Sequence, residues 1–217
     1  MINSLREYYS SSVLDNRIVV DDLWRKRCLG YNIQYIFSDD QLDSIIGIQR
    51  RIGGKELFNL HLLPRQSLHI SIAWILATRV EYDQSKSQIW RNIENECYSK
   101  LEKISKSFPE YTVHFQDVVA TDTAIVLIAK DNGETAEIRK MILDQLPIPQ
   151  ETNNNSQIIH TTLFRYARPL ENPAIFLEQI SNIKIDLPIK IDSMSIRKEL
   201  IYPSIKSKLL FSDCLEK

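Results

Sequence analysis

The sequence has few of the residues that mark several specialised classes of protein. Its 217 residues include only three cysteines, Cys28, Cys97 and Cys214, which are widely spaced and form no CxxC pair. This pattern indicates neither a disulfide framework nor a zinc knuckle, and it is typical of proteins in a reducing compartment. With only five glycines, the chain also has no glycine-rich phosphate loop. We therefore expect a cytoplasmic protein with free thiols.

The chain also lacks a long apolar run and an excess of either charge. No stretch approaches the roughly 18 apolar residues that a membrane span needs, and the polar N-terminus has no signal-peptide core. Lysine and arginine number 27 against 28 acidic residues, which gives a net charge of −1. A near-neutral protein has no general electrostatic surface for long duplex nucleic acid, although local groups can hold a small anion. We expect neither a membrane nor a long nucleic acid as a partner.

Metal-ligand patterns are missing as well. The sequence contains no HExxH, and its four histidines form no cluster with carboxylates at ligand spacing. We therefore predict a protein that uses no metal and no other cofactor.

The chain does have the composition of an ordinary globular protein, with 43% hydrophobic and 25% charged residues. Apolar spacing and turn residues predict helices and strands in alternation. Helices are expected at residues 38–54, 84–106, 134–146 and 171–183. Strands are expected in two runs within 57–76, as a hairpin within 111–130, at 157–166, and in two or three runs between 185 and 210.

The middle and the end of the chain repeat one pattern, in which a strand with a histidine is followed by a helix and further strands. This repeat predicts an α+β fold of two pseudo-symmetric lobes. Each lobe is expected to be an antiparallel sheet with helices on its outer face, and the lobes to flank a central cleft. We expect residues 1–35 to form a mostly helical extension. Residues 36–217 would form the main domain, with strands exchanged between lobes in a single globular unit.

Two strand-like runs carry a histidine followed two positions later by a hydroxyl residue. SLHISIAW contains His69 and Ser71, and QIIHTTLFRY contains His160 and Thr162. Because side chains two positions apart in a strand share a face, each pair lies on one side of its strand. Two such motifs among four histidines, 91 residues apart and at equivalent points of the repeat, indicate a common site. The alternative is that both pairs are ordinary half-exposed residues of one-sided sheets.

These motifs resemble those of the 2H phosphoesterase superfamily, which carries two H-x-T/S motifs on paired strands. SLHISIAW is similar to the first motif. HTTLFR is similar to the second in the H-x-T-L-x-R form of bacterial 2′-5′ RNA ligase-like proteins and RNA 2′,3′-cyclic phosphodiesterases. The resemblance covers about residues 40–212 in element order and departs from the family at Ser71, where threonine is usual. It implies metal-free cleavage of cyclic or 2′-5′-type phosphodiesters.

Two facing histidines suit this chemistry. Cleaving a phosphodiester needs a base to activate water or a hydroxyl and an acid to protonate the leaving oxygen, and imidazole can supply either near neutral pH. We therefore predict that His69 and His160 are catalytic, with the assignment of base and acid left open. Ser71 and Thr162 are expected to donate hydrogen bonds to non-bridging phosphate oxygens.

Three residues at the end of the second motif are candidate substrate contacts. Arg165 suits a phosphate or sugar, but five positions from the motif histidine it reaches the cleft only if the strand bulges or ends there. Phe164 and Tyr166 share the histidine's face under regular alternation, so each is expected either to stack on a base or to pack on its neighbours. His61 and His114 have no hydroxyl residue at i+2 and are expected to be structural or on the surface.

The sequence thus predicts a metal-independent phosphodiesterase, a phosphoric diester hydrolase, acting on a small nucleotide or a short oligonucleotide. Candidate substrates are a 2′,3′-cyclic phosphate end, a 2′-5′-linked oligonucleotide and a cyclic oligonucleotide signal. One alternative is an RNA-end processing or ligase-like enzyme, and another is a module that senses a nucleotide without turning it over. The oligomeric state is not set by the sequence, and a monomer is expected.

Overall fold

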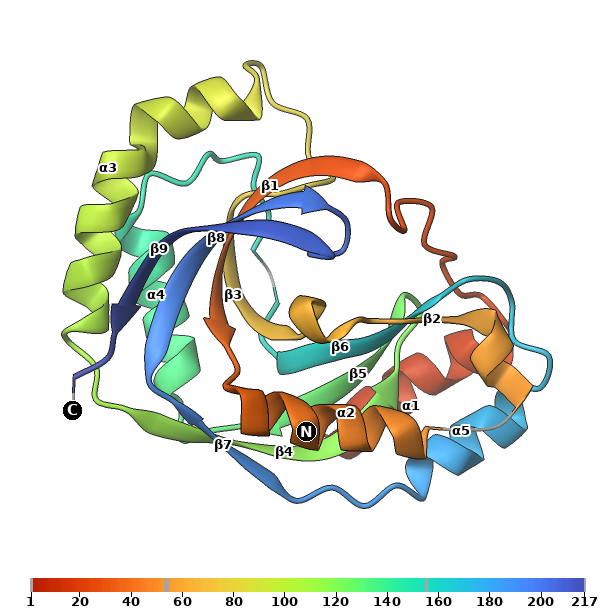
Figure 1. Cartoon of the computed structure of the whole chain (residues 1–217). Helices are drawn as coiled ribbons and strands as arrows, with labels where there is room; N and C mark the ends of the chain where they lie inside the picture. Colours follow the sequence, from red (N-terminus) through yellow and green to blue (C-terminus); the bar gives the residue numbers. More distant parts are fainter. Residues whose placement is uncertain (1, 53–54, 155, 217) are drawn as a thin grey trace.

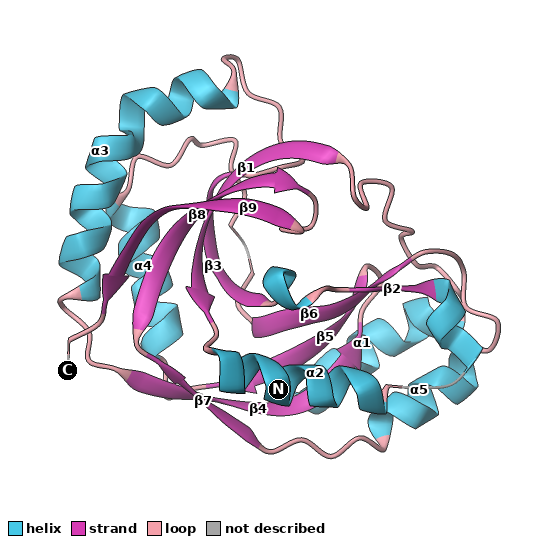
Figure 2. Cartoon of the chain, in the orientation of Figure 1, coloured by secondary structure: helices cyan, strands magenta, loops and turns pink. Residues whose placement is uncertain are grey.

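The structure is a computed structural model that describes residues 2–52, 55–154 and 156–216 (Figures 1 and 2). Its helices are α1 (Ile2–Leu14), α2 (Asp39–Arg51), α3 (Lys86–Ser105), α4 (Glu134–Gln145) and α5 (Pro173–Ser181), with 3₁₀ turns η1 (Lys55–Asn59) and η2 (Arg65–Ser67). Its strands are β1 (Arg27–Ile36), β2 (Leu60–Leu62), β3 (His69–Leu76), β4 (Tyr111–Ala120), β5 (Ala124–Lys130), β6 (Ile159–Tyr166), β7 (Leu187–Ile191), β8 (Ser193–Ile201) and β9 (Lys206–Cys214).

The strands form two antiparallel sheets (Figure 2). The four-stranded sheet has the order β3-β1-β8-β9, and the five-stranded sheet has the order β2-β6-β5-β4-β7. The sheets approach each other where β3, an edge strand of the first, contacts β6 of the second. α3 packs against β9 and α4 against β3, whereas α1 and α5 pack against β4. The predicted two-lobed α+β fold with outer helices is confirmed.

Local sequence signals explain where the predicted helices begin. The Ser38 side chain accepts a hydrogen bond from the backbone N–H of Gln41, and the Gln41 side chain accepts one from the backbone N–H of Ser38. This reciprocal capping box starts α2. Ser85 caps α3 by accepting a hydrogen bond from a backbone N–H in its first turn. The sequence also predicts that Gly53 and Gly54 end α2, but both lie outside the described residues.

The N-terminal region differs from its prediction. α1 is a helix, but Arg27–Ile36 form β1, which lies between β3 and β8 in the four-stranded sheet. The prediction of a mostly helical extension over residues 1–35 is therefore wrong for residues 27–35. A domain boundary after residue 35 is also wrong, because it would cut a strand that hydrogen bonds to both of its neighbours.

The strand signal of β1 is a two-residue alternation that the helical interpretation overlooked. Tyr31, Ile33 and Tyr35 are at most 1% exposed and belong to the main core cluster. Asn32 and Gln34 alternate with them and therefore point to the other face of the sheet. Both are also buried, at 3% and 2% exposed. This second face is the one that carries the candidate site.

Two expectations from composition can also be compared with the structure. All three cysteines are free thiols. In the part of the chain that the structure describes, no helix is long and apolar enough to cross a membrane.

Candidate functional site

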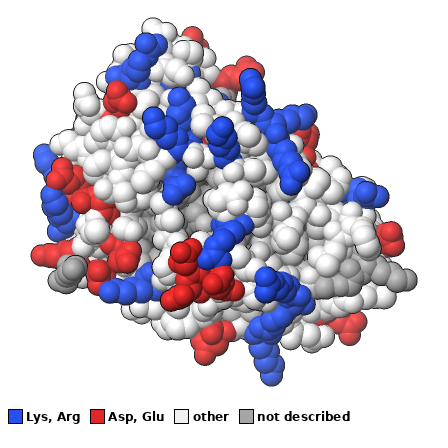
Figure 3. All heavy atoms as spheres, viewed as in Figure 1, with Lys and Arg blue, Asp and Glu red and all other residues white. Residues whose placement is uncertain are grey.

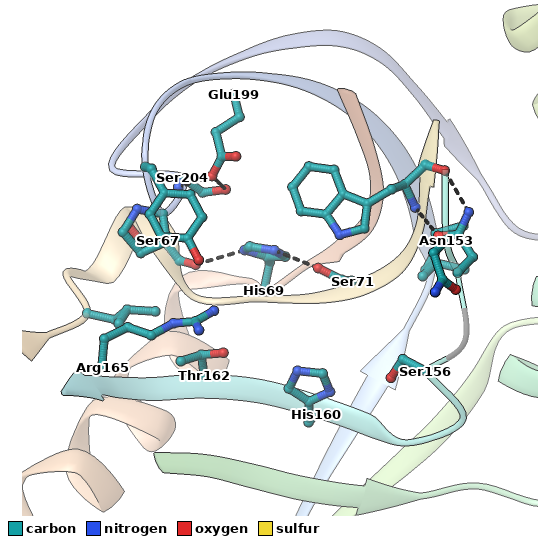
Figure 4. Close-up of a pocket in the computed structure, with 17 residues that line it drawn as sticks. Ser67, His69, Ser71, Asn153, Ser156, His160, Thr162, Arg165, Glu199 and Ser204 are labelled. Carbon is teal, nitrogen blue, oxygen red and sulfur yellow. Dashed lines mark hydrogen bonds between the residues drawn. The ribbon is translucent and has the colours of Figure 1, made fainter. Parts of the chain in front are cut away.

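The two predicted motifs lie on opposite walls of one cavity of about 270 Å³ (Figure 4). His69 and Ser71 reach it from β3, and His160 and Thr162 reach it from β6. Both histidines are half-buried. The structure therefore brings together two pairs of residues that stand 91 positions apart in the sequence. The cavity is also lined by Trp74, Asn153, Ser156, Glu199, Tyr202 and Ser204.

A bulge in β6 places Arg165 in the same cavity. Thr162 and Phe164 pair with consecutive residues of β5, so Leu163 is an extra residue on β6. The extra residue resets the alternation of side chains, and Arg165 therefore joins the motif residues in lining the cavity. This is the condition under which the sequence predicted that Arg165 would reach the cleft.

The same bulge turns Phe164 and Tyr166 away from the cavity. They are 1% and 0% exposed, and neither lines the cavity. The hydroxyl of Tyr166 donates a hydrogen bond of 2.9 Å to the backbone carbonyl of Thr121. The prediction that either ring stacks on a substrate base is wrong, because it assumed regular alternation along β6 and the extra residue Leu163 directs both rings into the core.

The other two histidines lie away from this cavity. The ring of His61 stacks on that of Trp24, with the ring centroids 4.4 Å apart. His114 is exposed on β4, opposite Lys130 of β5. These positions agree with the expectation that His61 and His114 are structural or on the surface.

Hydrogen bonds determine which nitrogen of His69 carries the proton. Its Nδ1 lies 2.8 Å from the backbone carbonyl oxygen of Ser67, which can only accept, so Nδ1 is the donor. In the neutral ring Nε2 therefore has a lone pair, and it lies 3.0 Å from the Oγ of Ser71. The side-chain amide of Asn32 donates to the same Oγ at 3.0 Å. The Ser71 hydroxyl hydrogen is thus left to point at Nε2 or at a ligand.

Both site histidines are neutral at pH 7. Burial lowers the pKa of His69 to about 4, and the positive charges of Arg197 and Arg165 contribute to the lowering. Burial is also the main cause of the pKa of about 4 for His160, with contributions from Arg139 and Arg165. A neutral imidazole is ready to act as a base. An imidazole that acts as an acid must first gain a proton, and a bound anionic phosphate favours this by offsetting the positive field.

We expect the two histidines to make the protein less stable as the pH falls from about 6.5 to 4. Each has a pKa of about 4 in the folded protein, against about 6.5 in the unfolded chain. In this window the unfolded chain binds more protons, so the free energy of unfolding falls as the pH falls. Thermal unfolding between pH 7 and pH 4 should show a smaller decrease in Tm for the double variant His69→Gln, His160→Gln than for the wild type. Equal decreases would contradict the two low pKa values.

Arg139 of α4 hydrogen bonds to the backbone at both strands that carry the site histidines. The sequence did not identify it as a site residue. Its side chain is buried and donates hydrogen bonds to the backbone carbonyls of Ile72 at 3.1 Å, Ser71 at 3.1 Å and Ile158 at 2.9 Å. The first two belong to β3, and the third precedes β6. One side chain therefore joins the two strands that carry the histidines. An arginine within an amphipathic helix gives no sequence signal that separates it from an ordinary surface residue.

Glu199 holds the turn that closes another side of the cavity. Its carboxylate is 3% exposed and accepts hydrogen bonds from the backbone N–H and the hydroxyl of Ser204, the latter at 3.0 Å. It also accepts a hydrogen bond of 2.6 Å from the hydroxyl of Thr78. The turn brings Tyr202 to the cavity, where its ring centroid lies 5.8 Å from the guanidinium carbon of Arg165. This wall places the Tyr202 ring next to the Arg165 guanidinium, beside the motif residues.

The face of the molecule shown in Figure 3 carries both basic and acidic side chains. Among the described residues, no group of three or more His, Cys, Asp or Glu side chains is placed to hold a metal ion. The positive charges that act on the histidines are the guanidinium groups of Arg139, Arg165 and Arg197.

Comparison with known proteins finds similarity in structure but not in sequence. No family model matches the chain, and no curated protein matches it significantly. Among solved structures, apo LigT of Escherichia coli aligns with a TM-score of 0.61 over 88% of this chain and 100% of LigT, at 12% identity. The protein TT0787 of Thermus thermophilus aligns with a TM-score of 0.61 over 86% of this chain and 97% of its own, at 10% identity.

A third structure, described as a phosphoesterase, aligns with a TM-score of 0.60 over 87% of this chain and 99% of its own, at 10% identity. All three alignments include nearly the full length of the compared proteins. The protein therefore has the two-lobed α+β fold of LigT and of this phosphoesterase, which confirms at the level of the fold the resemblance that the two motifs indicated.

Proposed function

We propose that this protein is a metal-independent phosphoesterase that cleaves a small nucleotide phosphodiester by acid–base catalysis with two histidines. The observation that carries the proposal is the position of His69 and His160 on opposite walls of one cavity. Each is accompanied by a hydroxyl residue, Ser71 or Thr162, and Arg165 lines the same cavity. The likeness in fold to LigT and to a phosphoesterase supports the same function.

His69 is suited to be the base in this reaction. Its Nδ1–H is held by the Ser67 carbonyl, so Nε2 carries the lone pair. When the Ser71 hydroxyl donates to the substrate instead of to Nε2, this lone pair can accept a proton from water or a substrate hydroxyl. His160, from the opposite wall, would then protonate the leaving oxygen. Ser71 and Thr162 would donate hydrogen bonds to the non-bridging oxygens as negative charge develops on them. In the reverse reaction the two histidines would exchange roles.

The proposed substrates are small. A cavity of about 270 Å³ holds a nucleotide-sized group, and the net charge of −1 gives the chain no general attraction for a long polyanion. LigT has been solved in complex with 3′-AMP, phosphate, NADP⁺ and ATP, so a protein of this fold binds nucleotides and phosphate. The candidates are a 2′,3′-cyclic phosphate, a 2′-5′-linked oligonucleotide and a cyclic oligonucleotide.

The test is turnover of a panel of 2′,3′-cyclic nucleotides, 2′-5′ oligoadenylates and cyclic di- and trinucleotides, with and without EDTA. We expect cleavage of at least one class and no effect of EDTA. Binding without turnover would instead support a nucleotide sensor, and inhibition by EDTA would contradict the metal-independent mechanism.

The likeness to LigT also motivates a second candidate, an RNA-end processing or ligase-like enzyme. Adding two RNA fragments to the same assay, one ending in a 2′,3′-cyclic phosphate and one beginning with a 5′-hydroxyl, separates the two reactions. A joined product would favour the ligase-like reaction, whereas a shortened or opened product would favour the hydrolase.

A further inference from the structure

A second cavity, of about 170 Å³, adjoins the first at His69 and Ser204, which line both. It extends along the face of the four-stranded sheet that includes Gln34 of β1 and Arg197 of β8. The catalytic mechanism proposed above uses neither of these two side chains. Any ligand that fills both cavities would pass directly beside His69.

Arg197 carries a positive charge that no carboxylate of the described residues neutralises in an ion pair. Its side chain is half-buried and donates a hydrogen bond of 3.0 Å to the hydroxyl of Ser207. Its Nε is buried with no hydrogen-bond partner, and no carboxylate of the described residues forms an ion pair with it. By contrast, Arg65 lines the same cavity but is paired with both Asp39 and Asp43. A partly buried, unpaired guanidinium favours an anionic ligand.

Gln34 is a second, independent sign of a ligand in this cavity. Its side chain is 2% exposed, and its Oε1 has no hydrogen-bond partner among the described residues. A buried amide oxygen without a partner costs free energy unless a ligand or water satisfies it. Rotating the terminal amide by half a turn exchanges its oxygen for its N–H donors, and in that setting the side chain can donate a hydrogen bond to an anion.

Two arginines, Arg165 and Arg197, flank the same histidine. Arg165 lines the first cavity and Arg197 the second, and the charges of both act on His69. We propose that the second cavity binds a phosphate next to the scissile one, with Arg197 and Gln34 as its contacts. The preferred substrate would then be an oligonucleotide with at least two phosphates, such as a 2′-5′-linked trimer or a cyclic dinucleotide. This inference rests on the function proposed above.

The test compares substrates with one phosphate, 2′,3′-cyclic AMP and 2′-5′-linked diadenylate, against two with two phosphates, 2′-5′-linked triadenylate and cyclic di-AMP. In the wild type, kcat/KM should be higher for the second pair. The quantity compared is kcat/KM for the two-phosphate substrates divided by kcat/KM for the one-phosphate substrates. Arg197→Met should lower this ratio by about 10- to 100-fold, the effect of losing one charge-assisted hydrogen bond. Gln34→Leu should lower the same ratio by a smaller factor. If Arg197→Met does not fold, this variant tests the second phosphate position instead.

Lys198→Met is the matched control. Lys198 is the next residue of β8 and also carries a positive charge, but its Nζ lies 5.7 Å from the ring centroid of Tyr31, on the opposite face of the sheet. This variant should leave the ratio unchanged. An equal loss on all substrates in Arg197→Met would overturn the inference, because it would mean that the charge acts only through His69.

A separate binding experiment tests the second cavity if the protein is not a phosphodiesterase. If the wild type turns over none of the four compounds, calorimetric binding of triadenylate and diadenylate still tests the second cavity. Tighter binding of triadenylate that Arg197→Met abolishes would support the second phosphate position, and equal binding of the two compounds would overturn it.

Discussion

Replacing either His69 or His160 with alanine is expected to lower kcat/KM by about 10²- to 10⁴-fold, the usual effect of removing a general acid or base. Both rings face the cavity, and each supplies the only imidazole on its wall among the described residues. Turnover of the best substrate found in the panel measures the loss. His114→Ala, an exposed position on β4, is the matched control and should keep full activity. A loss of less than tenfold in either site variant would contradict the two-histidine mechanism.

A substrate with a better leaving group separates the roles of the two histidines. If His160 is the acid, its loss matters little when the leaving oxygen needs no proton, as with a nitrophenyl ester of a nucleotide. His160→Ala should therefore recover most of its activity on such an ester, whereas His69→Ala should not. The opposite result would reverse the assignment that the Ser67 hydrogen bond suggests.

Replacing Arg139 with methionine should lower the free energy of unfolding by about 3 kcal/mol or more. The substitution keeps much of the side-chain volume but leaves the carbonyls of Ser71, Ile72 and Ile158, which are buried or partly buried, without their charged donor. Unfolding in urea measures the change. Lys140→Met, the next residue of α4 and exposed, is the matched control and should change stability by less than about 0.5 kcal/mol.

Arg139 should also act on catalysis through position rather than through contact with the substrate. It joins β3 to the start of β6, so its loss should loosen the spacing of the two histidines. We expect kcat to fall more than KM rises, because the relative positions of base and acid matter most in the transition state. In Arg139→Lys the ammonium group can still donate to some of the three carbonyls. This variant should therefore be more active than Arg139→Met. A stability loss with unchanged kcat per folded molecule would make its role purely structural.

Much of the fold follows from local patterns in the sequence. A capping residue and apolar spacing predict α2, apolar spacing predicts α3, and β-rich runs predict β3 and β6. β1 was missed although its alternation was present, because it lies in a segment that was interpreted as helical. The two histidine motifs were recognisable because each is contained within a few residues of one strand.

Other features of the site depend on pairing between distant segments. The position of Arg165, and the burial of Phe164 and Tyr166, follow from the extra residue in β6, which exists only relative to β5. No rule of local alternation predicts where such a bulge occurs. The unpaired state of Arg197 likewise depends on which acidic side chains the fold brings near it.

The sequence by itself therefore determined the helices, most of the strands and the two histidine–hydroxyl motifs, since these depend on residues close together in the chain. Only the tertiary structure decided that the motifs face each other, that Arg139 joins their strands, and that a second cavity lies beside His69. The physical reason is that each of these features is a contact between segments that are far apart in the chain, and its geometry depends on strand register and packing.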